Sequence, residues 1–166
     1  MKGLFGRLAV AVLCIAGFKV PADAELTGEL APDFVLKSVS GANYRLSEYR
    51  GQIVLVSFWA SWCGDCRTQL KTLAELQARY PNVGWQMFGV SVDRDLDEVG
   101  DTARASGVGF PALHDVEGRV SKRYAVDEMP YVVLIDRDGI VRYAHAGYRK
   151  GEESEYLDEA RALLAE

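Results

Sequence analysis

The chain has 166 residues and a formal charge of −5 at pH 7, with 19 lysine and arginine residues against 24 aspartate and glutamate residues. This length favours one domain with a substantial core. The acidic balance gives a nucleic-acid-binding role no electrostatic support.

The first 24 residues are expected to direct export and to stay outside the fold. Lys2 and Arg7 precede an apolar stretch over residues 8–18, and an A-x-A pattern follows at Ala22 and Ala24. This order is typical of a secretory signal peptide, and the stretch is shorter than the roughly 20 residues that span a bilayer. We predict a signal peptide over 1–24, a linker over 25–30 and one folded domain over 31–166, with an uncleaved N-terminal anchor as the alternative.

Apolar periodicity in the remaining chain predicts alternating strands and helices. Residues 53–59, I-V-L-V-S-F-W, are typical of a central strand buried on both faces. The other expected strands span 31–36 and 41–46, with a turn near residues 40–43, then 85–92, 131–135 and 140–146. The expected helices span 66–80, 97–106 and 152–164. Alternation predicts parallel strands in the first half, and Asp138-Gly139 predicts a late hairpin, so the fold class is α/β with a mixed sheet covered on both faces.

Two cysteines follow the strongest predicted strand, in the segment F-W-A-S-W-C-G-D-C. Cys63 and Cys66 lie where a strand passes into a helix, and the free N–H groups and dipole at a helix start favour thiolate over thiol. We expect Cys63 to be exposed and to attack first, and Cys66 to resolve the mixed disulfide. If Cys14 leaves with the signal peptide, these two cysteines should be able to pair in an oxidising compartment.

The segment F-W-A-S-W-C-G-D-C-R resembles the active-site segment of the thioredoxin superfamily. The A-P-D-F-V-L opening, L-S-E-Y-R-G-Q-I-V-L-V, V-S-V-D and M-P-Y-V-V-L-I-D-R-D-G narrow the resemblance to exported TlpA/ResA-like thiol-disulfide oxidoreductases with a redoxin (AhpC/TSA-like) domain. It runs from Ala31 to the C-terminal helix. It implies a thioredoxin-like three-layer α/β/α sandwich with an N-terminal β-hairpin extension.

The resemblance also implies function and partners. The chain is expected to exchange a Cys63–Cys66 disulfide or dithiol with protein substrates in the periplasm or another extracytoplasmic space. No cofactor and no stable metal are expected, and the protein is expected to be a monomer that takes electrons from a membrane thiol reductase. Cytochrome c maturation and repair of misoxidised exported proteins both fit this family.

Other site residues follow from the same resemblance. The bond before Pro130 is expected to be cis and to face the disulfide, which leaves the Met129 backbone free to pair with an extended substrate. Trp62 and Gly64 are expected to shape the site, with Trp59 and Trp62 packing around it.

Two departures from the family pattern bear on the chemistry of the site. Asp65 replaces the usual proline of the C-x-P-C motif, and its charge disfavours a thiolate on Cys63, which predicts a reductant. Ser57 stands where cytosolic thioredoxins place a buried aspartate. Another group or water must therefore move the proton during resolution, and Glu128 and Asp65 are the candidates, each with a solvated acid as the alternative.

Two rival functions remain open. Peroxiredoxins share the opening motif, but they place a threonine three residues before the reactive cysteine, and Ala60 stands there in this chain. A copper carrier would need a wider spacing between its two cysteines, and a tetrahedral zinc site would need two more ligands. His114 and His145 lack metal-ligand spacing to a cysteine, and residues 93–98, D-R-D-L-D-E, are expected to form a solvated loop and helix start.

Overall fold

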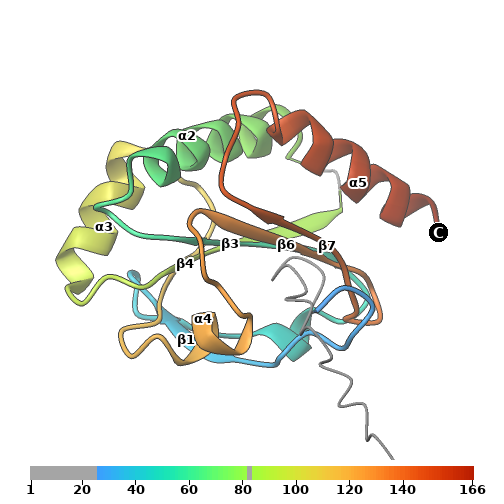
Figure 1. The fold of residues 1–166 in the computed structure, drawn as a ribbon, viewed down its shortest axis with the longest axis horizontal. Helices are drawn as coiled ribbons and strands as arrows, with labels where there is room; N and C mark the ends of the chain where they lie inside the picture. The colour runs from blue at the N-terminus through green and yellow to red at the C-terminus, as the bar shows by residue number, and fades with distance from the viewer. Residues whose placement is uncertain (1–25, 82–83) are drawn as a thin grey trace, which may run out of the picture.

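The computed structural model describes residues 26–81 and 84–166 (Figure 1). The predicted signal peptide lies outside these residues. Seven strands form one sheet, bounded as follows: β1 Val35–Ser38, β2 Asn43–Arg45, β3 Ile53–Trp59, β4 Trp85–Ser91, β5 Ala112–His114, β6 Tyr131–Ile135 and β7 Val141–Ala146. The helices are the 3₁₀-helix η1 Leu46–Tyr49 and the α-helices α2 Gly64–Arg79, α3 Leu96–Ala105, α4 Arg119–Arg123 and α5 Glu153–Ala165.

The sheet is mixed and has β3 near its centre. Its strand order is β2-β1-β5-β4-β3-β6-β7. The β3–β4 and β4–β5 pairs are parallel, whereas β3–β6, β6–β7, β1–β2 and β1–β5 are antiparallel. The predicted N-terminal hairpin, central parallel pair and late hairpin are therefore confirmed, and the fold is thioredoxin-like.

Each face of the sheet has its own apolar core. All seven residues of β3 are buried, and alternate side chains of a strand point to opposite faces. Ile53, Leu55 and Trp59 pack with α2, α3 and α5 in one cluster, whereas Val54, Val56 and Phe58 pack with α4 and the N-terminal segment in the other. Figure 1 shows α2 and α5 above the sheet, α3 at its left side and α4 below it.

The structure corrects several predicted boundaries and adds three elements. The first strand begins at Val35 and not at Ala31, because the backbone N–H of Ala31 instead bonds the Gly139 carbonyl at 2.9 Å, beside a Leu30–Ile140 bridge. The elements η1, β5 and α4 were not predicted. Each has only three to five residues, too few to show an apolar period.

Among the described residues, no helix is both long enough and apolar enough to cross a membrane.

Candidate active site

The two cysteines of the CxxC motif lie at the junction of β3 and α2, as predicted. They form a disulfide, with 5.2 Å between their Cα atoms. Cys63 is the N-cap of α2, and its sulfur accepts a hydrogen bond from the Cys66 backbone N–H at 3.1 Å. Cys63 is half-buried, whereas Cys66 is fully buried. An attacking sulfur must be reachable and a resolving one need not be, so this difference supports the predicted division of roles.

A buried carboxylate holds the turn that leads into the motif. Asp93 follows β4, and its two oxygens accept hydrogen bonds from the Ser61 backbone N–H at 2.9 Å, the Ser61 hydroxyl at 2.8 Å and the Ser91 hydroxyl at 2.7 Å. Its own carbonyl lies 2.8 Å from a His114 ring nitrogen. The prediction that residues 93–98 are all solvated is therefore wrong for Asp93, which is 2% exposed, because it is drawn inward by these donors.

The rest of that acidic run behaves as predicted. Asp95 is the N-cap of α3 and accepts the Asp97 N–H at 2.8 Å, and Asp97 and Glu98 lie exposed in its first turn. The sequence signal for Asp93 was its position directly after a buried strand, where it reaches the same sheet edge as the end of β3.

The Met129-Pro130 bond is cis, as the resemblance implied. Tyr131 pairs with Phe58 in the β3–β6 register, so one step further along both strands places Pro130 beside the end of β3. The Pro130 carbonyl accepts the Gly147 N–H at 2.8 Å, and Met129 is half-buried against the same cluster as Cys63. Glu128 is exposed, and a side chain at Gly147 would come within 3.0 Å of its carboxylate.

The two tryptophans before the motif differ in their environments. Trp59 is fully buried, and a Cβ at Gly89 would lie 3.0 Å from its Nε1, so glycine is needed there for close packing. Trp62 is 70% exposed, so it does not pack into the core as Trp59 does. Its exposed indole presents an apolar surface at the residue directly before Cys63.

The two residues between the cysteines are both exposed. Asp65 lies in the first turn of α2, where a carboxylate is favoured by the helix dipole. A Cβ at Gly64 would meet open space, so the backbone does not require glycine at this position.

The buried Ser57 side chain begins a series of hydrogen bonds. Its hydroxyl donates to Gln69 at 2.9 Å, and Gln69 continues to Tyr156 and Glu152. Sequence reasoning missed these three partners. The available signal was Gln69, a polar residue on the otherwise apolar inner face of α2.

His145 lies on β7 and pairs with α5 rather than with a cysteine. Its Nε2 lies 2.9 Å from Glu159. Burial alone lowers the pKa of His145, but the hydrogen bond and charge of Glu159, with the charges of Glu155 and Glu152, raise it on balance. Ligand atoms of His145, Glu152 and Glu155 lie within 4.8 Å of one another. Glu152 already accepts from Tyr156 and Arg149, so we interpret the group as an ion-pair cluster.

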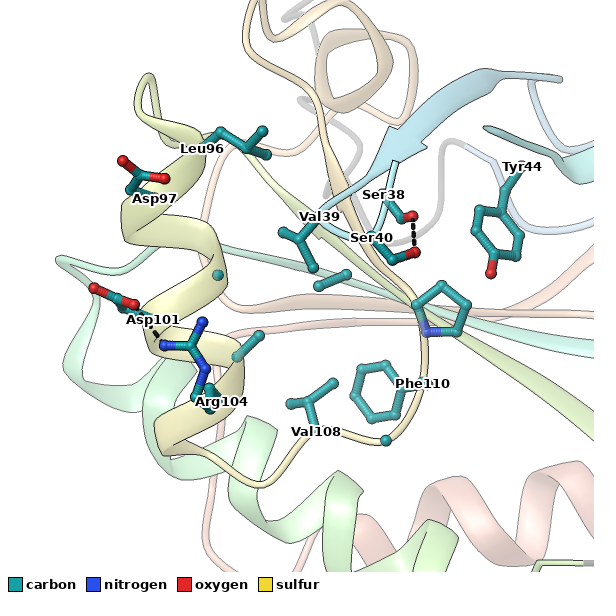
Figure 2. A pocket seen from close by; sticks show the side chains of 15 residues that line it. Ser38, Val39, Ser40, Tyr44, Leu96, Asp97, Asp101, Arg104, Val108 and Phe110 are labelled. Carbon is teal, nitrogen blue, oxygen red and sulfur yellow. Dashed lines mark hydrogen bonds and ion pairs between the residues drawn. The ribbon is translucent and has the colours of Figure 1, made fainter. Parts of the chain in front are cut away.

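A cavity of about 720 Å³ lies between α3, the loop over residues 107–111 and the β1–β2 turn (Figure 2). Four of its polar side chains are paired with each other, Ser38 with Ser40 at 2.8 Å and Asp101 with Arg104 at 2.7 Å. No residue of the CxxC segment or of the Met129-Pro130 loop lines it. The disulfide chemistry therefore belongs to the surface at the start of α2 and not to this cavity.

Comparison with known proteins agrees with this geometry. The AhpC/TSA family model matches residues 27–144. The thiol-disulfide oxidoreductase ResA of Geobacillus thermodenitrificans is 33% identical over 138 residues, which cover 83% of this chain and 79% of that protein. The thioredoxin-like protein YneN of Bacillus subtilis is 31% identical over 130 residues, covering 77% of this chain and 76% of that protein.

Solved structures show the same relationship. A Chlorobium tepidum protein described as thiol:disulfide interchange protein DsbE is 34% identical and superposes with a TM-score of 0.74, over 84% of this chain and 96% of that one. The chain therefore belongs to the AhpC/TSA family and is a ResA-like thiol-disulfide oxidoreductase with a Cys63–Cys66 disulfide.

Proposed function

We propose that the protein reduces disulfide bonds of other proteins outside the cytoplasm. The observation that supports this direction is the exposed Asp65 carboxylate, which lies two residues after Cys63 in the first turn of α2. A neighbouring negative charge opposes the thiolate, and a pair whose reduced form is less stabilised is a stronger reductant.

The steps follow from the positions of the two sulfurs. The Cys63 thiolate attacks a substrate disulfide and forms a mixed disulfide, and Cys66 then attacks the Cys63 sulfur and releases the reduced substrate. The chain is left with its Cys63–Cys66 disulfide, and a dithiol donor such as a membrane thiol reductase returns it to the reduced form. The exposed Trp62 and the Met129 backbone form the proposed docking surface for an extended substrate.

The reduction potential of the Cys63–Cys66 pair tests this direction. Equilibration with glutathione should give a value nearer to thioredoxin's, about −270 mV, than to DsbA's, about −120 mV. A value close to that of DsbA would identify an oxidase instead. Acceptance of a cytochrome c precursor peptide or of misoxidised exported proteins would then separate the two cellular roles.

Replacing Asp65 with asparagine is expected to lower the pKa of Cys63 and make the pair more oxidising. The side chain is exposed, so solvent screens its charge, and a change of ~1 kcal/mol corresponds to roughly 20 mV in a two-electron potential. Asp65→Pro, which restores the family residue, should shift the potential in the same direction.

Glu75→Gln is the matched control, because Glu75 is exposed on the same helix but far from its start. An Asp65→Asn potential equal to that of the wild type would show that Asp65 only begins the helix.

Thiol peroxidase activity is the second candidate, favoured by the AhpC/TSA family match. Ala60, which is buried, stands where the peroxidase pattern has its threonine. Consumption of hydrogen peroxide without a thiol partner protein would support the peroxidase, and its absence would leave the reductase.

Export is proposed from residues 1–24. Mass spectrometry of the protein from its native host should find an N-terminus near Glu25 outside the cytoplasm. An intact segment from Met1 to Ala24 in the membrane fraction would instead show an anchored protein.

A further inference from the structure

A line of four hydrogen-bonded polar side chains crosses the core behind Cys66. The Ser57 hydroxyl lies 2.9 Å from Gln69 Oε1, Gln69 Nε2 lies 3.3 Å from the Tyr156 hydroxyl, and that hydroxyl lies 3.1 Å from Glu152 Oε2. Ser57, Gln69 and Tyr156 are fully buried, and Glu152 is 8% exposed. Polar groups are costly to bury unless they are paired. This line joins β3, α2 and α5 inside an otherwise apolar cluster.

The charge on Glu152 fixes the direction of every hydrogen bond in the line. An ionised carboxylate only accepts, and Glu152 is held by the Arg149 guanidinium at 3.1 Å and the Arg149 backbone N–H at 3.1 Å. Tyr156 must therefore donate to it. Burial first, and then the charge and hydrogen bond of Glu152, raise the pKa of Tyr156 well above its usual range, which keeps the phenol protonated.

The remaining bonds follow from that first one. The Tyr156 oxygen accepts from the Gln69 amide nitrogen, so the Gln69 carbonyl faces Ser57 and accepts its hydroxyl hydrogen. Ser57 then has only oxygen lone pairs left to offer. As long as Glu152 is charged, the inner end of the line is an acceptor and not a donor.

Ser57 and Cys66 occupy the same side of the sheet. Side chains two positions apart on a strand point to the same face, so Ser57 shares its face of β3 with Ile53, Leu55 and Trp59. Those three residues pack in one cluster with Cys66 and Leu70. Cys66 and Gln69 are three residues apart on α2, and such residues are neighbours on a helix surface. The Ser57 oxygen therefore lies in the same buried region as the Cys66 side chain.

We propose that Glu152 is a positioning residue for Cys66: through Tyr156 and Gln69 it holds Ser57 as a hydrogen-bond acceptor for the Cys66 thiol and disfavours the Cys66 thiolate. The inference rests on disulfide exchange at Cys63–Cys66 and not on the direction of electron flow.

The proposal assigns the proton in the resolving step. When a substrate disulfide oxidises the dithiol, the Cys63 thiolate attacks one substrate sulfur and the other leaves as a thiolate. Cys66 then gives its proton through water to that thiolate. The Cys66 sulfur attacks the Cys63 sulfur, and the substrate sulfur held in the mixed disulfide leaves with the bonding electron pair. Two electrons move from the cysteine pair to the substrate. The energy of deprotonating Cys66 therefore enters both the rate and the potential.

Other charged groups surround this region and must be separated from Glu152. Asp65 and Arg67 lie exposed on α2, and Asp93 approaches from the end of β4 through Ser61. On the far side, His145 packs against Tyr156 with ring centroids 5.0 Å apart and is paired with Glu159. Of the charged groups in the part of the chain that the structure describes, only Glu152 is joined to Ser57 by the hydrogen bonds described above.

The test uses Glu152→Gln in the full-length chain with Cys14→Ser, so that only Cys63 and Cys66 carry thiols. Removing the charge frees the line to reverse and present a donor to Cys66, so the pKa of Cys66 should fall, measured by thiolate absorbance with Cys63→Ser added. In the protein that keeps both cysteines, the equilibrium constant with glutathione should move roughly three- to tenfold toward the dithiol, about 15–30 mV. Glu155→Gln, which makes the same charge change on an exposed residue of the same helix, should move it by less than about twofold.

A double-mutant cycle separates the line from a through-space charge effect. In a Ser57→Ala background, Glu152→Gln should have no further effect on the pKa of Cys66, because the acceptor is already gone. An equal shift with and without Ser57, or equal shifts from Glu152→Gln and Glu155→Gln, would overturn the proposal.

Tyr156→Phe breaks the line without changing charge, and it should shift the pKa of Cys66 in the same direction. Tyr156→Phe also serves as the test variant if the Glu152→Gln protein does not fold. A lowered unfolding temperature with an unchanged Cys66 pKa in Tyr156→Phe would show that the line only fastens α5 to the sheet, and the proposal would be wrong.

Discussion

The Cys66→Ser variant is expected to accumulate a mixed disulfide between Cys63 and its substrate proteins, whereas Cys63→Ser should trap little. Cys63 is partly accessible and caps α2, so its sulfur can meet a substrate, but Cys66 has no exposed surface. Without the resolving sulfur, the mixed disulfide cannot be released within the chain. Turnover of a protein disulfide should fall to the uncatalysed rate in both variants.

The measurement is non-reducing electrophoresis of protein captured from the native host, followed by identification of the trapped partners. The double variant Cys63→Ser/Cys66→Ser is the control for adducts formed elsewhere on the chain, Cys14 included. Equal trapping by the two single variants would show that the roles of the cysteines are not divided as the burial indicates.

Replacing Asp93 with alanine is expected to cost about 2–4 kcal/mol in the free energy of unfolding. The change removes the acceptor for the Ser61 backbone N–H and for two serine hydroxyls in a buried position. Because Ser61 begins the turn into Trp62 and Cys63, disulfide exchange should also slow in protein that remains folded. Denaturant titration gives the first quantity, and reduction of a model protein disulfide gives the second.

Asp95→Ala is the matched comparison two residues away. Asp95 is an exposed N-cap of α3, and losing such a cap costs about 1 kcal/mol without touching the CxxC turn. An Asp93→Ala loss no larger than the Asp95→Ala loss, with unchanged exchange activity, would contradict the role assigned to the buried carboxylate.

Local patterns in the sequence determined the strong elements and the centre of the chemistry. β3 and β6 have the predicted bounds, because a continuous run of β-branched and aromatic residues can bury its side chains only when both faces of the strand are covered. The start of α2 at the CxxC motif followed from the same reasoning, since the strand had to end before the helix began. The Met-Pro motif before β6 correctly implied the cis bond.

Tertiary structure alone decided which polar residues are buried beside that centre. Asp93 and Asp95 look alike in an acidic run, but only Asp93 meets donors from Ser61 and Ser91. Gln69, Tyr156 and Glu152 lie up to 87 residues apart and become neighbours only when α5 packs across α2 and β3. The exposure of Trp62 likewise depends on which residues pack near it in the folded protein. Periodicity reports which face of an element is apolar, whereas the pairing of a buried polar atom depends on partners from distant segments.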